Sequence, residues 1–156
     1  MEDDPLIEVV PAKATHVRRV ARLMRRADRD EVFAASGLSP AQSLTFSLRK
    51  SSAAWCVLVD GRPEILFGVA DLNVLAGVAA PWLLGTDAVT AHRRAFLRGS
   101  VAWRGKLLSQ YEVLRNLVDD RNAISKRWLK WLGFTLSDAV PIGHEGAAFL
   151  LFELRR

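Results

Sequence analysis

The stretch Asn122-Ala-Ile-Ser-Lys-Arg-Trp-Leu-Lys-Trp-Leu-Gly-Phe134 decides the fold. Asn122 carries a short polar side chain of the kind that caps a helix N-terminus, and apolar residues recur at helical spacing as far as Leu132. Gly133 is placed to end that helix. The apolar run Val113–Val118 comes shortly before it and is typical of a strand. The sequence therefore predicts a strand, a helix from Asn122 to Leu132, and a reversal into another extended segment.

Working outward from this stretch, short apolar runs predict further strands on both sides of it. The dipeptide Asp60-Gly61 between two of them predicts an antiparallel hairpin. The Gly-Val-Ala-Ala-Pro segment, residues 77–81, is interpreted as a turn region. The remaining predicted strands are Ile7–Val10, Trp55–Val59, Glu64–Leu72, Trp82–Thr86, Phe134–Ile142 and Ala147–Leu154.

Three more helices are expected from the spacing of apolar residues. The first begins near Thr15, the second runs from Ser39 to Lys50 with proline at its first position, and the third runs from Thr90 to Tyr111. The predicted order is β-α-α-β-β-β-α-β-α-β-β. This order predicts an α/β (α+β) protein, with a mixed twisted sheet of six to seven strands and four helices in a single domain over residues 1–156.

Composition predicts one globular domain that needs no metal ion or disulfide bond for its stability, because 50% of the 156 residues are hydrophobic and 25% are charged. The single cysteine, Cys56, lies in an apolar run and is expected to be a buried thiol and not a nucleophile. No metal site is predicted. The acidic N-terminus resembles no signal peptide and no apolar run reaches the ~20 residues of a membrane span, so a cytoplasmic protein is expected. A net charge of +5 favours anionic ligands or partners, and no nucleic-acid-binding motif accompanies it.

The order of elements resembles that of the GNAT acyltransferases, and residues 122–134 resemble the Asn-led helix ending in Gly-Phe of that fold. The resemblance implies that the fourth and fifth strands splay apart beside the Asn122 helix. It also implies that acetyl-CoA binds between them in active members.

A narrower resemblance is to the internal core proteins of short-tailed phages. It rests on the Gly-Arg-Pro hairpin at residues 61–63, Trp82 followed by Thr86-Asp87, a basic helix ending near Tyr111, and the Asn122 helix with a Phe-rich last strand. This resemblance implies a catalytically degenerate protein that acts in virion assembly or as a minor virion component. Its expected partners are phage virion or assembly proteins, and its expected place is the host cytoplasm or the virion.

The loop that binds the cofactor diphosphate in active family members, Gln/Arg-x-x-Gly-x-Gly/Ala, is absent from residues 85–94. Asp87 would bring a negative charge close to that diphosphate, whereas nearby basic side chains can replace backbone amides as donors. The candidate cofactor-binding residues are Leu84, Thr86, His92, Arg93, Arg94 and Asn122.

The general acid of the family, a tyrosine seven residues after the helix-leading asparagine, is replaced by Leu129. The only tyrosine, Tyr111, is expected to pack with its hydroxyl at the surface. Catalytic residues are therefore not assigned. The residues able to act as a base, each of which can equally be a turn cap or a surface charge, are Asp71, His92, Glu112, Asp119, Asp120 and His144.

These departures predict that the slot lined by Leu84, Asn116, Leu129 and the start of the His92 helix is occluded or too apolar, with Trp82 and Trp128 filling it. No cofactor is then expected. Protein contacts are assigned to an arginine stripe on the first helix, Arg18, Arg22, Arg25 and Arg29. Two alternatives stay open: an acetyl-CoA-dependent N-acetyltransferase with an atypical cofactor loop, and a regulatory binder of an anionic ligand.

Overall fold

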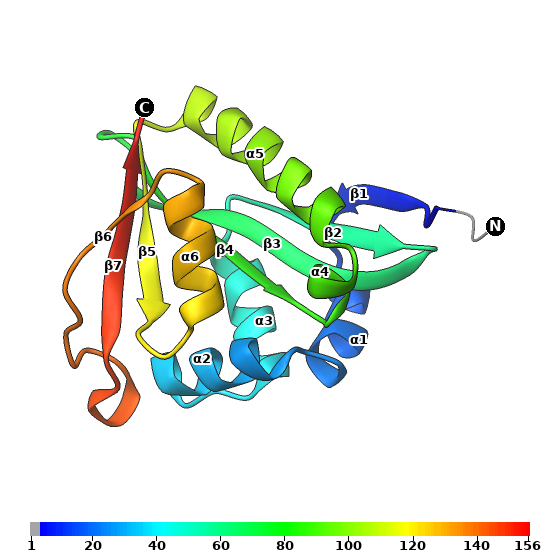
Figure 1. Cartoon of the computed structure of the whole chain (residues 1–156), viewed down its shortest axis with the longest axis horizontal. Helices are drawn as coiled ribbons and strands as arrows, with labels where there is room; N and C mark the ends of the chain where they lie inside the picture. Colours follow the sequence, from blue (N-terminus) through cyan, green and yellow to red (C-terminus); the bar gives the residue numbers. More distant parts are fainter. Residues whose placement is uncertain (1–3) are drawn as a thin grey trace.

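A seven-stranded mixed sheet organises the computed structural model, which describes residues 4–156 (Figure 1). The strand order is β1-β2-β3-β4-β5-β7-β6, and every neighbouring pair is antiparallel except β4 and β5. This is the mixed α/β sheet that the sequence predicts. The strands are β1 Ile7–Pro11, β2 Ala53–Val59, β3 Arg62–Asn73, β4 Val78–Gly85, β5 Val113–Asp119, β6 Thr135–Leu136 and β7 Phe149–Arg155.

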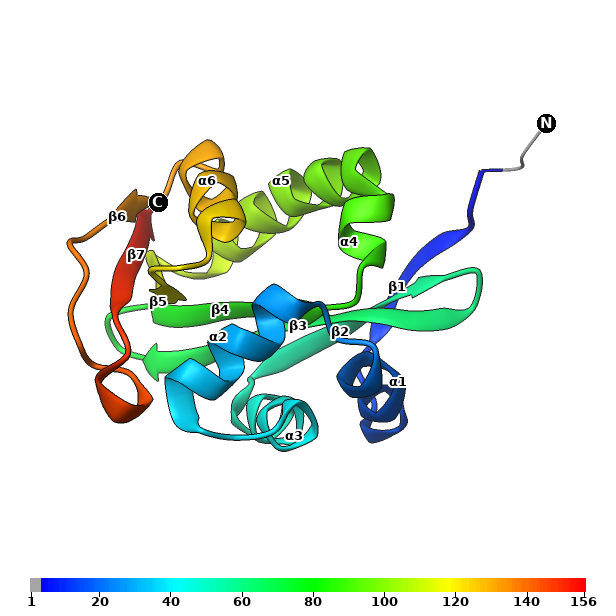
Figure 2. The ribbon, with the colours of Figure 1, turned by 60° about the horizontal axis from the view of Figure 1, so that its bottom comes forward.

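Helices cover both faces of the sheet (Figure 2). α1, α2 and α3 lie on one face, and α4, α5 and α6 lie on the other. Each layer encloses its own apolar cluster, one built around Val20, Leu44 and Leu66 and the other around Leu114, Leu129 and Phe152. The helices are α1 Val17–Arg22, α2 Arg26–Ser36, α3 Pro40–Lys50, α4 Ala88–Ala91, α5 Arg93–Gln110 and α6 Ala123–Trp131, with short 3₁₀ turns η1 Ala14–His16 and η2 His144–Gly146.

β4 and β5 pair at one end only. Their parallel register holds at Val78 with Val113 and at Ala79 with Leu114, after which the two strands separate toward Gly85 and Asp119. Figure 1 shows them diverging beside α6. The predicted splay is therefore confirmed, and it opens the middle of the sheet between the two helical layers.

The local turn and cap chemistry agrees with the sequence. Asp60 and Gly61 both have positive φ, as a two-residue hairpin turn between right-twisted strands requires. The Asn122 side chain accepts a hydrogen bond from the Ser125 N–H at 3.1 Å and caps α6. Gly133 has φ +100° and ends the helix. The chain therefore reverses into β6 as residues 122–134 predict.

Six α-helices are found in residues 4–156, where four were predicted, because two of the predicted helices are broken. The first breaks at residues 23–25. Met24 forms a β-bridge with Thr86, and the Arg25 N–H donates to the Gly85 carbonyl at 2.9 Å. The second break is at His92, whose φ/ψ of −114°/43° separates α4 from α5. Pairing with the end of β4 thus overrides the helical pattern of the first segment.

Two strand predictions are wrong in extent. Residues 78–81, interpreted as a turn, begin β4, and the segment after Phe134 forms only the two-residue β6. Pro81 is tolerated inside β4 because its missing N–H lies on the edge that faces the splay, where no ladder bond is lost. Among the described residues, no helix combines the length and the apolar character that a membrane crossing needs.

Candidate functional site

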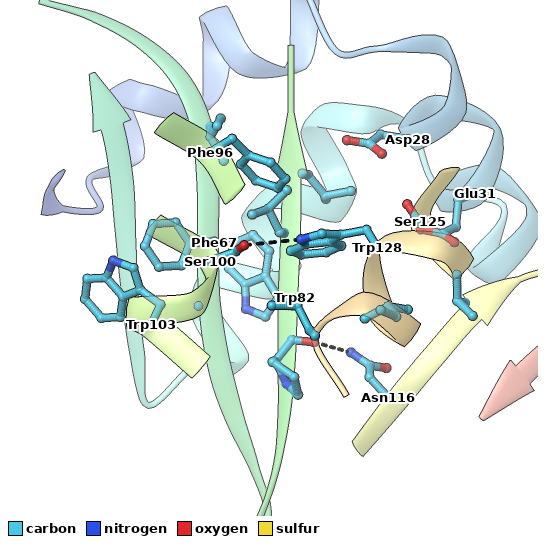
Figure 3. A pocket seen from close by; sticks show the side chains of 18 of the residues that line it. Asp28, Glu31, Phe67, Trp82, Phe96, Ser100, Trp103, Asn116, Ser125 and Trp128 are labelled. Atoms are coloured by element: carbon cyan, nitrogen blue, oxygen red, sulfur yellow. Dashed lines mark hydrogen bonds between the residues drawn. The ribbon is translucent and has the colours of Figure 1, made fainter. Parts of the chain in front are cut away.

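A cavity of about 440 Å³ extends from the gap between β4 and β5 over β1, β2 and β3, with further lining from α2, α5 and α6 (Figure 3). Leu84, His92, Asn116 and Leu129, which the sequence predicts to line the slot, all contribute to it. Its volume is within the range of ordinary ligand sites, and most of its lining is apolar. The slot is therefore open, and the other half of the expectation, that it is too apolar to hold a pantetheine arm, stays a prediction.

The two tryptophans expected to fill the slot pack against different elements. Trp82 packs with the cluster under α1 and α3, and its indole N–H donates to the Ser51 hydroxyl at 2.7 Å. Trp128 instead reaches from α6 toward α5, where its indole N–H donates to Ser100 at 3.3 Å and its ring lies 5.2 Å from that of Phe96. Trp128 therefore joins two walls of the cavity, and Trp82 is held by α3.

The edge of β4 that faces the cavity keeps unpaired backbone groups. In an antiparallel ladder, alternate residues point their N–H and C=O groups at the neighbour. The Thr86 N–H donates to the carbonyl of Glu64 on β3, which places the groups of Leu83 on the opposite edge, toward β5. The described part of β5 does not pair with β4 there. The Leu83 N–H and C=O are thus free to bond a ligand.

The groups on either side of Leu83 on this edge have partners. The Pro81 carbonyl accepts a hydrogen bond from Asn116 Nδ2 at 2.9 Å, across the gap from β5 (Figure 3). The Gly85 N–H donates to Asp28 at 2.9 Å. The free groups are therefore confined to the middle of the splay.

Two carboxylates on α2 close the wide end of the splay. Asp28 is fully buried and accepts two hydrogen bonds from the Arg25 guanidinium, at 3.0 and 2.9 Å, beside the one from Gly85. Glu31, one turn later, accepts the N–H of Asp119 at the end of β5 at 2.7 Å. Both side chains line the cavity (Figure 3).

Glu31 is held in an environment that disfavours its charge. Burial raises the pKa of Glu31 to about 7, against the hydrogen bond from the Asp119 N–H, and the nearby negative charges of Asp28 and Asp119 add to the increase. The side-chain amide of Asn122 lies beside Glu31 and lowers that pKa in turn. A carboxyl group of this kind exchanges its proton near neutral pH.

The predicted cofactor residues lie in three kinds of place: in the cavity lining, buried beside it, and exposed on α5. Leu84 and His92 line the cavity. The Thr86 hydroxyl is buried and bonded to Glu64, which Arg19 also contacts at 2.7 Å, so Thr86 supports the end of β4 and does not face the cavity. Asn122 is buried as the cap of α6. Arg93 and Arg94 are exposed in the first turn of α5.

The β4–α4 loop differs from an anion-binding loop in its hydrogen bonds. The N–H groups of residues 85, 86 and 88–92 all donate within the protein, to Asp28, Glu64, the Thr86 hydroxyl and the carbonyls of residues 86–88. By contrast α5, which follows the break at His92, has no side-chain cap. Among the described residues, no backbone hydrogen bond joins its first N–H groups, on residues 93–95, to the carbonyls of α4. The free amides of this region therefore lie one turn further along the chain.

Most candidate bases have structural roles. Asp119 is paired with Arg121 at 2.7 Å, and although burial raises its pKa, the hydrogen bonds and charge of Arg121 bring that pKa below its usual value. Asp120 pairs with Lys126 at 3.1 Å, and Glu112 pairs with Arg156. Asp71 is exposed. His144 packs edge-on against Phe33. Of the predicted set, only His92 lines the cavity.

Cys56 and Tyr111 are placed as the sequence predicts. Cys56 is fully buried, and burial raises its pKa to about 11. Tyr111 packs against the cluster under α5 and α6, with its hydroxyl 3.2 Å from Ser52. In residues 4–156, no group of three or more His, Cys, Asp or Glu side chains is arranged to hold a metal ion.

The arginine stripe does not form one surface. Arg25 is bound to Asp28, and Arg29 donates to the carbonyls of Ala21, Arg22 and Met24 at the end of α1. Arg18 and Arg22 are exposed. The break between α1 and α2 is the reason, since a continuous helix would have placed all four side chains on one stripe. Partner binding stays a prediction for the four arginines, of which Arg18, Arg22 and Arg29 are exposed.

Asp28 and Glu31 are functional candidates that the sequence interpretation missed. Asp28 lies four residues before the apolar Val32, a spacing that would have placed both on the inward face of α2. That signal was lost because the segment was interpreted as one helix continuing from Thr15, in which acidic residues among arginines look like a solvated face.

Neither a scan of protein-family models nor a search of curated proteins gives a match. Solved structures do match. A Chromobacterium violaceum protein assigned to the GNAT acetyltransferases is 14% identical, with a TM-score of 0.73 over 96% of this chain and 87% of that one.

Two further matches were solved with a cofactor. The ribosomal L7/L12 α-N-protein acetyltransferase RimL in complex with coenzyme A is 8% identical, with a TM-score of 0.69 over 96% and 93% of the two chains. The Salmonella typhimurium protein yncA, assigned as an acetyltransferase and solved with acetyl-CoA, is 11% identical, with a TM-score of 0.68 over the same shares. This chain therefore has the fold of the GNAT acetyltransferases.

Proposed function

We propose that the protein is an acetyl-CoA-dependent N-acetyltransferase with an atypical cofactor loop. The observation that carries this proposal is the cavity at the β4–β5 splay, into which Leu83 presents an unpaired N–H and C=O. An extended arm bearing amides, such as the pantetheine of coenzyme A, has the donors and acceptors that such an edge can bond. Most of the lining is apolar, which suits the alkyl parts of the same arm.

The diphosphate would be held at the start of α5. Its first N–H groups carry the positive end of the helix dipole, and Arg93 and Arg94 add two exposed cations at the same turn. These residues replace the glycine loop, whose amides are already used within the protein. Acetyl-CoA would supply the acetyl group as an activated thioester. The chain's own part is to hold the arm along Leu83 and to orient the acceptor toward it.

Release of free coenzyme A thiol in the presence of primary amines tests the proposal. The only cysteine, Cys56, is fully buried, so a thiol-reactive dye gives little background from the folded protein. We expect turnover by the wild-type chain and at least a tenfold higher KM for acetyl-CoA in the Arg93→Ala/Arg94→Ala variant. Absence of turnover with every amine tried would remove the enzymatic proposal.

One observation favours a second candidate, a catalytically degenerate virion or assembly protein of the phage internal core type. Leu129 occupies the position of the family's general acid, and its buried alkyl side chain has no proton to transfer. Trp128, next to it, donates a hydrogen bond to Ser100 on α5. Such a protein would act through contacts with phage proteins, with Arg18 and Arg22 as candidate contact residues. Mass spectrometry of purified virions from a phage carrying the gene tests this candidate. Absence of the protein from both virions and assembly intermediates would remove the virion proposal.

A further inference from the structure

The cavity extends beyond the splay into a lobe between α5 and the sheet, called the α5 lobe below. The floor of the lobe is formed by Val9 on β1, Val57 and Val59 on β2, Ile65 and Phe67 on β3, and Leu83 on β4. Cross-strand pairing joins these residues into one surface, since Val57 lies opposite both Val9 and Ile65. Neighbouring strands lie about 4.8 Å apart, so the floor spans about 14 Å from β4 to β1, much more than an acetyl group.

The roof of the α5 lobe is the sheet-facing side of α5. Its lining residues recur at about one helical turn, and they include Phe96, Gly99 and Trp103. At Gly99 the helix contributes no side chain, and a Cβ added there would have no side-chain or strand atom within 4 Å. The helix therefore stands off the sheet at Gly99, and the lobe is space that neither element fills.

Trp103 closes one end of the α5 lobe. Its ring lies 4.3 Å from that of Trp55 and 5.1 Å from that of Phe67, and the Lys106 ammonium lies 4.4 Å from the centre of the same indole. Figure 3 shows Phe67 and Trp103 on the side of the cavity away from Asn116. Toward β1 the lobe is open, because Val9 on its floor is 45% exposed. The lobe is therefore a slot with an aromatic end wall and an open edge.

The polar side chains of α5 beside the lobe are already bonded within the protein. The Ser100 hydroxyl donates to the Leu97 carbonyl at 2.8 Å and accepts the Trp128 indole N–H at 3.3 Å. Arg104 donates to the Leu132 carbonyl at 2.7 Å. The floor residues have apolar side chains only. A polar group entering the lobe would lose its water without gaining a hydrogen bond, so the ligand group that fits is an alkyl chain.

We propose that the α5 lobe binds the straight alkyl chain of a medium-chain acyl-CoA, so that the preferred acyl donor is larger than acetyl-CoA. The proposal rests on the proposed acyltransferase function and names its donor class. Continuity carries it, because Leu83 at the splay lies directly opposite Phe67 in the lobe, and both line one cavity. The helix that roofs the lobe also presents Arg93 and Arg94 at its start, where an anionic group would be held. A free fatty acid shares the chain and the negative charge, and the experiment distinguishes the two sources.

Calorimetric titration of the wild-type protein with acetyl-CoA, octanoyl-CoA and octanoate tests the lobe. Each buried methylene raises affinity about fourfold, from about 0.8 kcal/mol of transfer free energy, so burial of three methylenes already gives more than about thirtyfold. We expect octanoyl-CoA to bind at least thirtyfold more tightly than either acetyl-CoA or octanoate. Equal affinities for the two thioesters would overturn the proposal without any variant.

Two variants of α5 locate the chain. Gly99→Leu fills the lobe from its roof and should lose at least tenfold in octanoyl-CoA affinity, with acetyl-CoA affinity within twofold of the wild type. Gly105→Leu is the matched control, since Gly105 is exposed on the same helix, has the same free space and lies outside the cavity lining. Both changes replace a helix-interior glycine with a better helix former, so both proteins should fold. An unchanged preference for octanoyl-CoA in folded Gly99→Leu would overturn the assignment.

The test separates this proposal from the function it rests on. Binding of acetyl-CoA and octanoyl-CoA with equal affinity removes the donor assignment and leaves the acetyltransferase proposal. Binding of octanoate that is lost in Gly99→Leu, with no binding of either thioester, shows a fatty-acid site and overturns both the donor assignment and the acetyltransferase proposal.

Discussion

Asp28 and Glu31 lie one turn apart on α2, and each accepts a hydrogen bond from the end of a different strand. Asp28 binds the N–H of Gly85 on β4 at 2.9 Å, and Glu31 binds the N–H of Asp119 on β5 at 2.7 Å. The strands are paired at their other ends, through Val78 and Val113. One helix therefore fixes the separation of two strands that no longer bond each other, which keeps the cavity between them open.

Replacing Asp28 with alanine should destabilise the fold strongly. The change leaves the half-buried Arg25 guanidinium and the Gly85 N–H without their acceptor. Removing one partner of a buried ion pair typically costs about 3–5 kcal/mol. Urea denaturation should show a loss of that size in the free energy of unfolding. Asp30→Ala breaks only an exposed contact with Arg26 and should change it by less than about 0.5 kcal/mol, so equal losses in the two variants would refute this role of Asp28.

Glu31 should make the protein less stable as pH rises from about 4.5 to about 7. Its pKa is about 7 in the folded protein, against an ordinary value of 4.5, so in this interval the unfolded chain releases the proton first. A tenfold difference in acidity corresponds to about 1.4 kcal/mol, which limits the loss to about 3 kcal/mol. Unfolding curves at pH 5 and pH 8 should show this loss in the wild type and a smaller one in Glu31→Gln. The same loss in both proteins would contradict the raised pKa.

The sequence predicts the sheet and the α6 motif well, because those features depend on local signals. Asn122 as a cap, Gly133 at positive φ and the Asp60-Gly61 hairpin each follow from the residue's own conformational preferences. The break between α1 and α2 could not be predicted in the same way. It is caused by Met24 and Arg25 pairing with Gly85 and Thr86, residues some sixty positions away.

The candidate site was only partly predictable for the same reason. Leu84, His92, Asn116 and Leu129 follow from the position of the splay, and all line the cavity. Glu31 reaches it only because α2 starts anew at Arg26 and crosses the ends of β4 and β5. A side chain whose role depends on such a long-range crossing leaves no periodic signal of its own.

Arg29 and Arg18 should respond differently to substitution. Arg29 donates to three carbonyls around the end of α1, so Arg29→Ala should cost about 1 kcal/mol in the free energy of unfolding. Arg18 is exposed on α1, and Arg18→Ala should cost less than about 0.5 kcal/mol. Chemical denaturation of both variants checks this difference. A larger loss of stability in Arg18→Ala than in Arg29→Ala would contradict this difference and would indicate that the arginine stripe is one structural surface.

Replacing Leu129 with a tyrosine, the general acid of the family, should not raise the rate of acetyl transfer. Leu129 is 5% exposed and packs in the cluster under α6, so Leu129→Tyr overpacks the core and should cost about 1–3 kcal/mol. Acetyl transfer should stay within about twofold of the wild type, because Leu129 lines the cavity and a larger side chain there takes up space that the cofactor arm would need. An increase of tenfold or more in kcat would show that the absent tyrosine limits the reaction.

Binding of acetyl-CoA is the measurement that tests the central claim most directly. Isothermal titration of the wild-type protein at physiological salt, repeated with Arg93→Ala/Arg94→Ala, separates specific binding from non-specific attraction to a chain of net charge +5. We predict saturable one-to-one binding that weakens at least tenfold in the double variant. No heat of binding and no rise in Tm at millimolar acetyl-CoA would contradict the account and favour a non-catalytic role for this fold.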